Sequence, residues 1–109
     1  MELARISNAQ SARGKSGAAD DLIARCLAAA ANGSVAAYFD LGVAYSTGSH
    51  GAECDLIEAH KWFNLAASQG HEEAVFCRAD VSEEMTAREI VEAQRRAREW
   101  LRAGHRKAA

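Results

Sequence analysis

Apolar residues recur at steps of three and four along most of the chain, the spacing that places them on one face of an α-helix. The first clear stretch repeats through Ile23, Cys26 and Ala30. Asn32-Gly33 ends it, because glycine adopts the left-handed conformation past a helix end at no steric cost. Before it, residues 1–18 contain clustered serine and glycine, which favour a flexible arm; a short docking helix is the alternative.

A second helix is expected from Ser34, a residue that caps free backbone N–H groups, to about Thr47. Gly42 in its middle costs about 1 kcal/mol relative to alanine, so we expect another helix to approach closely there. One face of this helix carries Ala37, Leu41 and Tyr45, with Tyr38 and Gly42 beside them. The opposite face carries Ala36, Asp40, Val43 and Thr47.

A third helix is expected between Asp55, with Glu58 three residues later as in a capping box, and the helix-ending Gly70. Its apolar stripe is wide, which suits a helix with neighbours on two sides. The stripe consists of Leu56, Ala59, Trp62, Phe63, Ala66 and Ala67.

Two further helices follow. One spans about residues 72–83, and the other begins at the capping box formed by Thr86 and Glu89 and ends at Gly104. The apolar positions of the first are Ala74, Phe76, Cys77 and Val81, and those of the second are Ile90, Ala93, Ala97, Trp100 and Leu101. The pattern therefore predicts about five helices and an all-α fold.

Composition adds three constraints to this picture. The 109 residues contain no proline and carry a net charge of −2, so one helical domain without an overall basic field is expected. No apolar run is long enough to span a bilayer, and the first residues lack a signal-peptide core, so we expect a cytoplasmic protein without a membrane partner. Three cysteines, Cys26, Cys54 and Cys77, are too few and odd in number for a disulfide framework.

Helix ends repeat along the chain. The segments AAAANGS and LAASQGH echo each other, and their glycines are 70 − 33 = 37 residues apart, while Gly70 and Gly104 are 104 − 70 = 34 apart. Such periods are typical of stacked helix pairs.

The sequence here resembles the Sel1-like repeat, a relative of the tetratricopeptide repeat. The first half of that motif is matched by Ala37, Leu41, Gly42, Tyr45 and Gly48. The second half is matched by Gly51, Asp55, Ala59, Trp62, Ala66, Ala67, Gln69 and Gly70. The loop after Gly48 is one residue longer than usual, Arg25 stands where Trp62 falls in the motif, and the third segment departs most. The stretch from Met85 to Trp100 also resembles the closing segment of small bacterial Sel1-like proteins.

This resemblance implies a short α-solenoid of antiparallel helix pairs that serves as a non-catalytic adaptor, without a cofactor or metal, for a protein or peptide partner. After the arm of residues 1–18, it divides the chain into a half-repeat helix (19–33), a complete repeat (34–70), a divergent capping repeat (71–104) and a tail (105–109). Its structural core is Ala37, Leu41, Gly42, Tyr45, Ala59, Trp62, Ala66, Ala67 and Gly70. We place partner binding on the opposite face of the second helix: Ala36, Asp40, Val43 and Thr47. Since repeat arrays need about three units for stability, self-association is a further expectation.

Other interpretations of individual residues are less favoured. The histidines His50, His60 and His71 lack the paired spacing with cysteine that zinc sites show. Cys54 stands near a helix start, where a thiolate is favoured, but Glu53 and Asp55 oppose its ionisation, so a thiol enzyme is not expected.

The arginines near the C-terminus and the tryptophans can each be interpreted as structural residues or as binding residues. Arg95, Arg96, Arg98, Arg102, Arg106 and Lys107 are expected on a solvated face; binding of nucleic acid or an acidic protein is the alternative function. Trp62 and Trp100 are expected in the core rather than as binding anchors. Phe39 points away from both faces of its helix and suits a contact with another helix or with a partner.

Overall fold

All regular structure in the described part of the chain is helical. The computed structural model describes residues 22–49 and 51–108. It contains a helix at residues 22–31, followed by α3 (Val35–Thr47), α4 (Leu56–Ser68), α5 (Glu72–Ser82) and α6 (Ala87–Ala108). The expected all-α class with five helices is confirmed for these residues. The arm expected at 1–18 and the histidine at position 50 lie outside them.

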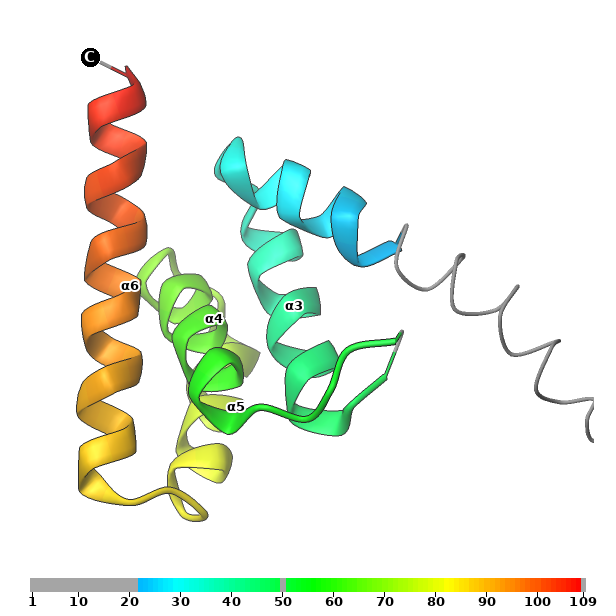
Figure 1. Cartoon of the computed structure of the whole chain (residues 1–109), viewed down its shortest axis with the longest axis vertical. Helices are drawn as coiled ribbons and strands as arrows, with labels where there is room; N and C mark the ends of the chain where they lie inside the picture. The colour runs from blue at the N-terminus through cyan, green and yellow to red at the C-terminus, as the bar shows by residue number, and fades with distance from the viewer. Residues whose placement is uncertain (1–21, 50, 109) are drawn as a thin grey trace, which may run out of the picture.

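Helix α4 is the centre of the fold. It packs against α3, α5 and α6, and Figure 1 shows α6 on one side of it and α3 on the other. The reason is its wide apolar stripe: Trp62, Phe63 and Leu65 are almost fully buried although they point in different directions around the helix. The expectation that this helix has neighbours on two sides is confirmed.

The expected starts of α3, α4 and α6 are also confirmed, because each begins at a side chain that satisfies free backbone N–H groups, whereas the start of the first helix lies outside the described residues. The Ser34 hydroxyl accepts from the Ala37 N–H at 3.2 Å, and the Asp55 carboxylate accepts from the Glu58 N–H at 3.2 Å. At α6 the box is reciprocal: the Glu89 N–H donates to Thr86 Oγ1 at 3.1 Å and the Thr86 N–H to Glu89 Oε1 at 2.9 Å.

The same turn occurs twice, before α3 and before α5. Gly33 and Gly70 have positive φ angles of 86° and 93°. The residue after each glycine donates its N–H back to an alanine carbonyl at 3.1 Å, Ser34 to Ala29 and His71 to Ala66. Each then caps the next helix, since His71 Nδ1 accepts from the Ala74 N–H at 3.1 Å as Ser34 does from Ala37. The sequence echo is therefore a repeated backbone structure.

Gly104 does not end the last helix, so that prediction was wrong. Helix α6 continues to Ala108, and residues 105–108 extend it rather than forming a separate tail. A glycine inside an exposed helix costs about 1 kcal/mol, which a 22-residue helix tolerates. Glycine stops a helix only where the chain adopts the left-handed conformation, and Gly104 is not among the positive-φ glycines.

Two residues assigned to apolar stripes lie at the surface. Phe76 is 70% exposed and Leu101 is 42% exposed. Helix α5 faces α4 through Ala74 and Val81, which are buried, and Phe76 lies on another side of the same helix. The apolar pattern predicted the helix correctly but did not show that this side of it lacks a neighbour.

Candidate protein-binding surfaces

The face of α3 assigned to partner binding is mostly exposed. Ala36, Asp40 and Thr47 are exposed, whereas Val43 is partly buried and packs against the core. The Val43 carbonyl accepts the hydroxyls of Ser46 at 3.1 Å and Thr47 at 2.9 Å, which holds the last turn of the helix. Three of the four residues thus form a solvent-facing strip, and their role in binding stays a prediction.

Asp40 lies close to the helix of residues 22–31. Burial raises the pKa of the Cys26 thiol, the negative charge of Asp40 raises it further, and Arg25 acts weakly in the opposite direction.

Most of the residues predicted to form the structural core are buried or packed against buried residues. Tyr45 and Ala67 are partly buried against it, and Gly70 is exposed at the turn. Six motif residues are buried: Ala37, Leu41, Gly42, Ala59, Trp62 and Ala66.

Both tryptophans belong to this core. Trp62, 1% exposed, stacks on Tyr38 with ring centroids 5.9 Å apart and meets the edge of Trp100 at 4.9 Å. The Trp100 N–H donates to the Tyr38 hydroxyl at 3.4 Å, whereas the buried Trp62 N–H has no acceptor among the residues that the structure describes. Trp62 is unsuited to be a binding anchor because no partner can reach it.

Helices α3 and α4 approach each other most closely at Gly42. A Cβ atom at this position would lie 2.5 Å from Phe63 Cδ1, well inside the 3.5–4.0 Å that carbon atoms keep. Phe63 is itself 2% exposed, so its ring has little room to move. This contact explains the glycine within α3.

Phe39 provides the contact from α3 to α5. Its ring stacks on His71 with a centroid distance of 4.3 Å and an interplanar angle of 14°, and it lies 5.7 Å from Phe63. Of the two roles left open for this residue, the structure shows the contact between helices.

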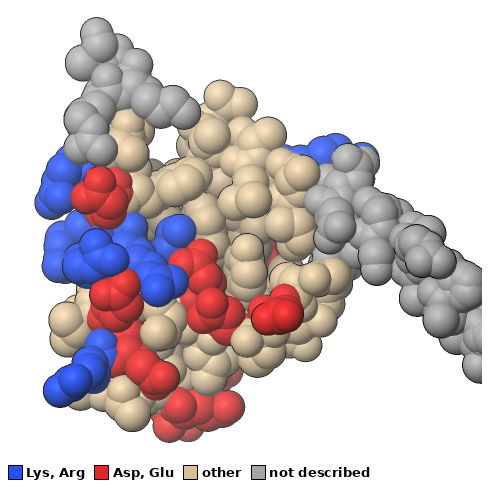
Figure 2. Space-filling view, in the orientation of Figure 1, with Lys and Arg blue, Asp and Glu red and all other residues tan. Residues whose placement is uncertain are grey.

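Three arginines of α6, Arg95, Arg96 and Arg102, are paired with carboxylates. Arg96 donates to Glu58 of α4 at 2.7 Å and to Glu92 at 2.8 Å, and Arg95 also binds Glu92. Hydrogen bonds from Arg95, and then from Arg96, lower the pKa of Glu92 to about 2. Figure 2 shows the resulting mixture of acidic and basic side chains over this side of the molecule.

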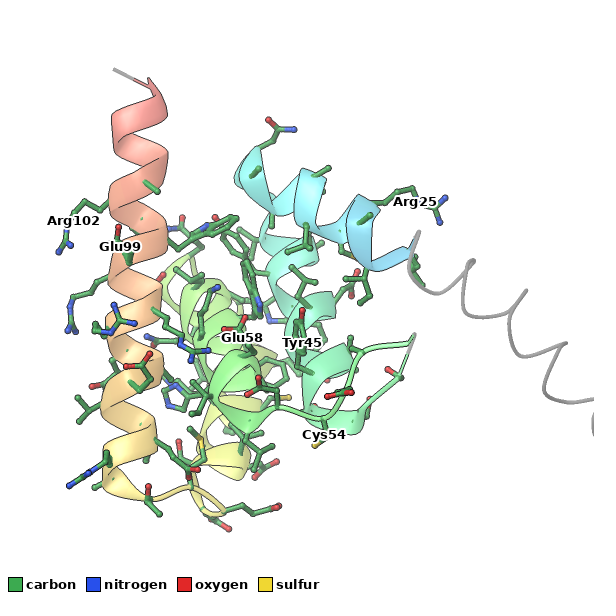
Figure 3. All side chains as sticks on the ribbon, in the orientation of Figure 1. Arg25, Tyr45, Cys54, Glu58, Glu99 and Arg102 are labelled. Atoms are coloured by element: carbon green, nitrogen blue, oxygen red, sulfur yellow. The ribbon has the colours of Figure 1, made fainter. Side chains whose placement is uncertain are left out.

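A shallow groove of about 250 Å³ lies beside these pairs, between α4 and α6. Lys61 lines this groove. The Lys61 ammonium lies 4.2 Å from the centre of the Trp62 ring and 3.4 Å from Glu58 Oε1. Further along α6, Glu99 and Arg102 project outward and pair at 3.0 Å (Figure 3). Arg88 and Arg98 of α6 are exposed and form no ion pair with a described residue, so carboxylates compensate the positive charge of this helix only in part.

Histidine and cysteine residues do not come together in a metal-binding group. Within residues 22–49 and 51–108, no three side chains of His, Cys, Asp or Glu are placed to hold an ion. Cys54 is exposed on the loop before α4, and its thiol lies 3.6 Å from the Ser46 carbonyl (Figure 3). His60 is 3% exposed, and its burial, followed by the charge of Arg78, lowers its pKa below the usual 6.5.

Sequence reasoning missed that Phe76 of α5 is the most exposed large apolar side chain among the described residues, ahead of Val91 of α6 at 60%. Val75 is 40% and Phe76 is 70% exposed, while every other aromatic residue is buried or partly buried. The spacing of acidic residues around Phe76 could have indicated its exposure. Glu72 and Glu73 precede Phe76 by four and three residues, and Asp80 follows it by four. Those spacings place carboxylates around a phenylalanine on one helix face, which is not the composition of a core-facing stripe.

None of the helices in the described residues combines the length and the apolar character needed to cross a bilayer. Comparison of the chain with family models, curated proteins and solved structures found no match.

Proposed function

We propose that this chain is a non-catalytic protein–protein interaction module, an adaptor built on a Sel1-like helical repeat. The observation that supports the proposal is that residues matching the Sel1-like motif are buried where α3 and α4 meet. Ala37 and Leu41 of α3 lie in one buried cluster with Ala59, Trp62 and Ala66 of α4. The motif thus fixes how the helices meet, and recognition is left to side chains that point away from the core.

The repeated turn supports the same proposal. Gly33-Ser34 and Gly70-His71 have matching hydrogen bonds, so the helix of residues 22–31 relates to α3 as α4 relates to α5. We propose on this basis that the helices form a short solenoid, with α6 as its closing element. An array of this type presents several helix surfaces side by side, which is how repeat proteins build extended binding faces.

For the binding surface of this adaptor we retain the strip on α3. Asp40 supplies a charged acceptor, Thr47 a hydroxyl, and Ala36 a small side chain beside which a partner backbone can pack. Val43 contributes the edge of the core rather than an independent contact. A protein or peptide partner with a donor opposite Asp40 fits this strip.

The test is affinity capture from the native cell, followed by binding measurements between the purified chain and each retained protein. Asp40→Lys should lose at least one specific partner while its circular dichroism and melting temperature stay close to wild type. Glu53→Lys, a charge reversal on the exposed loop before α4, serves as the matched control. The α3 strip is wrong if Asp40→Lys keeps every partner with unchanged affinity, and the adaptor function is wrong if wild type binds none of them when purified.

A further inference from the structure

We propose that α5 carries a second docking surface, for a basic amphipathic helix of a partner protein. The surface, here called the Phe76 face, consists of Val75, Phe76 and Ala79 with a rim of Glu72, Glu73 and Asp80. The inference rests on the proposed function, and it adds a new surface and the chemistry of its occupant.

The Phe76 face is a compact apolar spot within an acidic border. All six of its residues are exposed. Residues three and four apart on a helix are surface neighbours, so Glu72, Glu73 and Asp80 border the Phe76 ring along the helix. A large aromatic side chain with charged neighbours is the composition of an interface hot spot and its rim.

The fold contains a covered counterpart of Phe76. The buried alanines Ala37 and Ala74 each donate the backbone N–H to a capping side chain, Ser34 and His71 respectively. Each alanine also precedes a phenylalanine by two positions, Phe39 and Phe76. Phe63 of α4 and His71 at the start of α5 cover the ring of Phe39. Phe76 stands in the same register but is 70% exposed. A helix supplied by another molecule would cover the ring of Phe76 in the same way.

The charge of the residues around Phe76 indicates which side chains the partner helix should carry. Glu58, Glu92 and Glu99 are each paired with an arginine. In contrast, Glu72, Glu73 and Asp80 form no ion pair with any residue of 22–49 or 51–108 that the structure describes. Burial raises the pKa of the Cys77 thiol, and the negative charges of Glu73 and Asp80 raise it further. This negative field favours arginine or lysine beside the apolar residue that contacts Phe76.

A second copy of this chain is a poorer occupant than a separate basic helix. Of the α6 arginines, Arg95, Arg96 and Arg102 are already paired within their own molecule, whereas Arg88 and Arg98 form no ion pair with a described residue. The exposed Val91 of α6 stands three residues after Arg88 and four before Arg95, so a second copy that used this side of α6 would have to break the pair of Arg95 with Glu92. Breaking that pair would offset the gain from new ones. The geometry therefore points to a partner helix with an apolar residue flanked by basic residues one turn away on either side.

The experiment is selection from a display library of randomised amphipathic helical peptides on the full-length protein, followed by affinity measurement of the enriched peptides. We expect enrichment of arginine and lysine one turn from an apolar residue. Phe76→Ser should weaken these peptides at least about tenfold, as loss of a hot-spot residue does. Glu73→Lys should weaken them several-fold and reduce the dependence of affinity on salt, because it removes an attraction that salt screens.

Two variants control for general effects of surface change. Leu27→Ser removes another exposed apolar side chain, and Glu53→Lys reverses another exposed acid. Both should leave peptide affinity within about twofold of wild type, because surface changes away from a contact have small effects.

The other outcomes separate this inference from the proposed function. Enriched peptides that lack basic residues, or that bind Phe76→Ser as well as wild type, would overturn it. Peptides that depend on Asp40 instead would leave the adaptor function standing and remove the Phe76 face. A dimer in sedimentation that Phe76→Ser dissociates would assign the face to a second copy. No enrichment at all would count against both proposals.

Discussion

Gly42→Ala tests the closest helix contact in the fold. The new Cβ would stand 2.5, 2.6 and 2.9 Å from three ring atoms of Phe63. Alanine has the better helix propensity, by about 1 kcal/mol. Overpacking a buried site costs about 1–3 kcal/mol, and the upper part of that range applies because the Phe63 ring is 2% exposed and enclosed. We expect a net loss of about 1–2 kcal/mol in the free energy of unfolding.

Gly104→Ala is the matched control, because it makes the same chemical change inside another helix. Outside its own helix, no atom of the described residues lies within 4 Å of a Cβ built on Gly104, so the gain in helix propensity is unopposed. This variant should gain up to about 1 kcal/mol. Urea unfolding followed by circular dichroism measures both changes, and a difference of this size corresponds to about 4–8 °C in melting temperature for each kcal/mol.

A double-mutant cycle assigns the effect to Phe63. Phe63→Leu shortens and narrows the side chain, so Gly42→Ala should cost less in that background, with a coupling energy of at least about 0.5 kcal/mol. The reasoning fails if Gly42→Ala stabilises the protein as Gly104→Ala does, or if the two substitutions are additive. Either result would show that the ring has room to move and that the helices do not require glycine.

Three further predictions concern the core, its pH dependence and the seam between α4 and α6. Trp62→Ala should lower the free energy of unfolding by about 3–5 kcal/mol in urea titrations, and a loss below about 1 kcal/mol would mean that the ring is not buried. Since the pKa of His60 is lowered in the fold, its contribution to stability is complete above pH 6.5 and falls as the pH drops below that value, because the unfolded chain then binds the proton more readily. Melting temperature should decline less steeply below about pH 6.5 in His60→Gln, and equal slopes would contradict the assignment. Glu58→Gln weakens the pair with Arg96 and should cost about 0.5–1 kcal/mol at low salt and less in 1 M salt; salt-independent values would exclude an electrostatic origin.

The sequence by itself determined where most helices begin and end. Capping residues and left-handed glycines act on the backbone within a few positions of themselves, so Ser34, Asp55, Thr86 and Gly70 could be assigned without any knowledge of the fold. Gly104 was misjudged for the same reason: glycine permits a helix end but does not impose one, and α6 passes through it. Several buried positions on α3 and α4, among them Leu41, Trp62 and Phe63, also followed from the period. Ala44, His60 and Leu65 are buried as well but were not predicted to be, because neighbouring helices cover more of each helix than its predicted stripe marks.

Tertiary structure alone decided which apolar faces have a neighbour. Phe39 and Phe76 occupy the same position in two helices, yet one is covered by His71 and Phe63 and the other is exposed. It also paired Glu58 with Arg96, residues far apart in the sequence. Helical periodicity depends on a residue's own segment, whereas burial and ion pairing depend on what another segment brings alongside, and that information is absent from the local pattern.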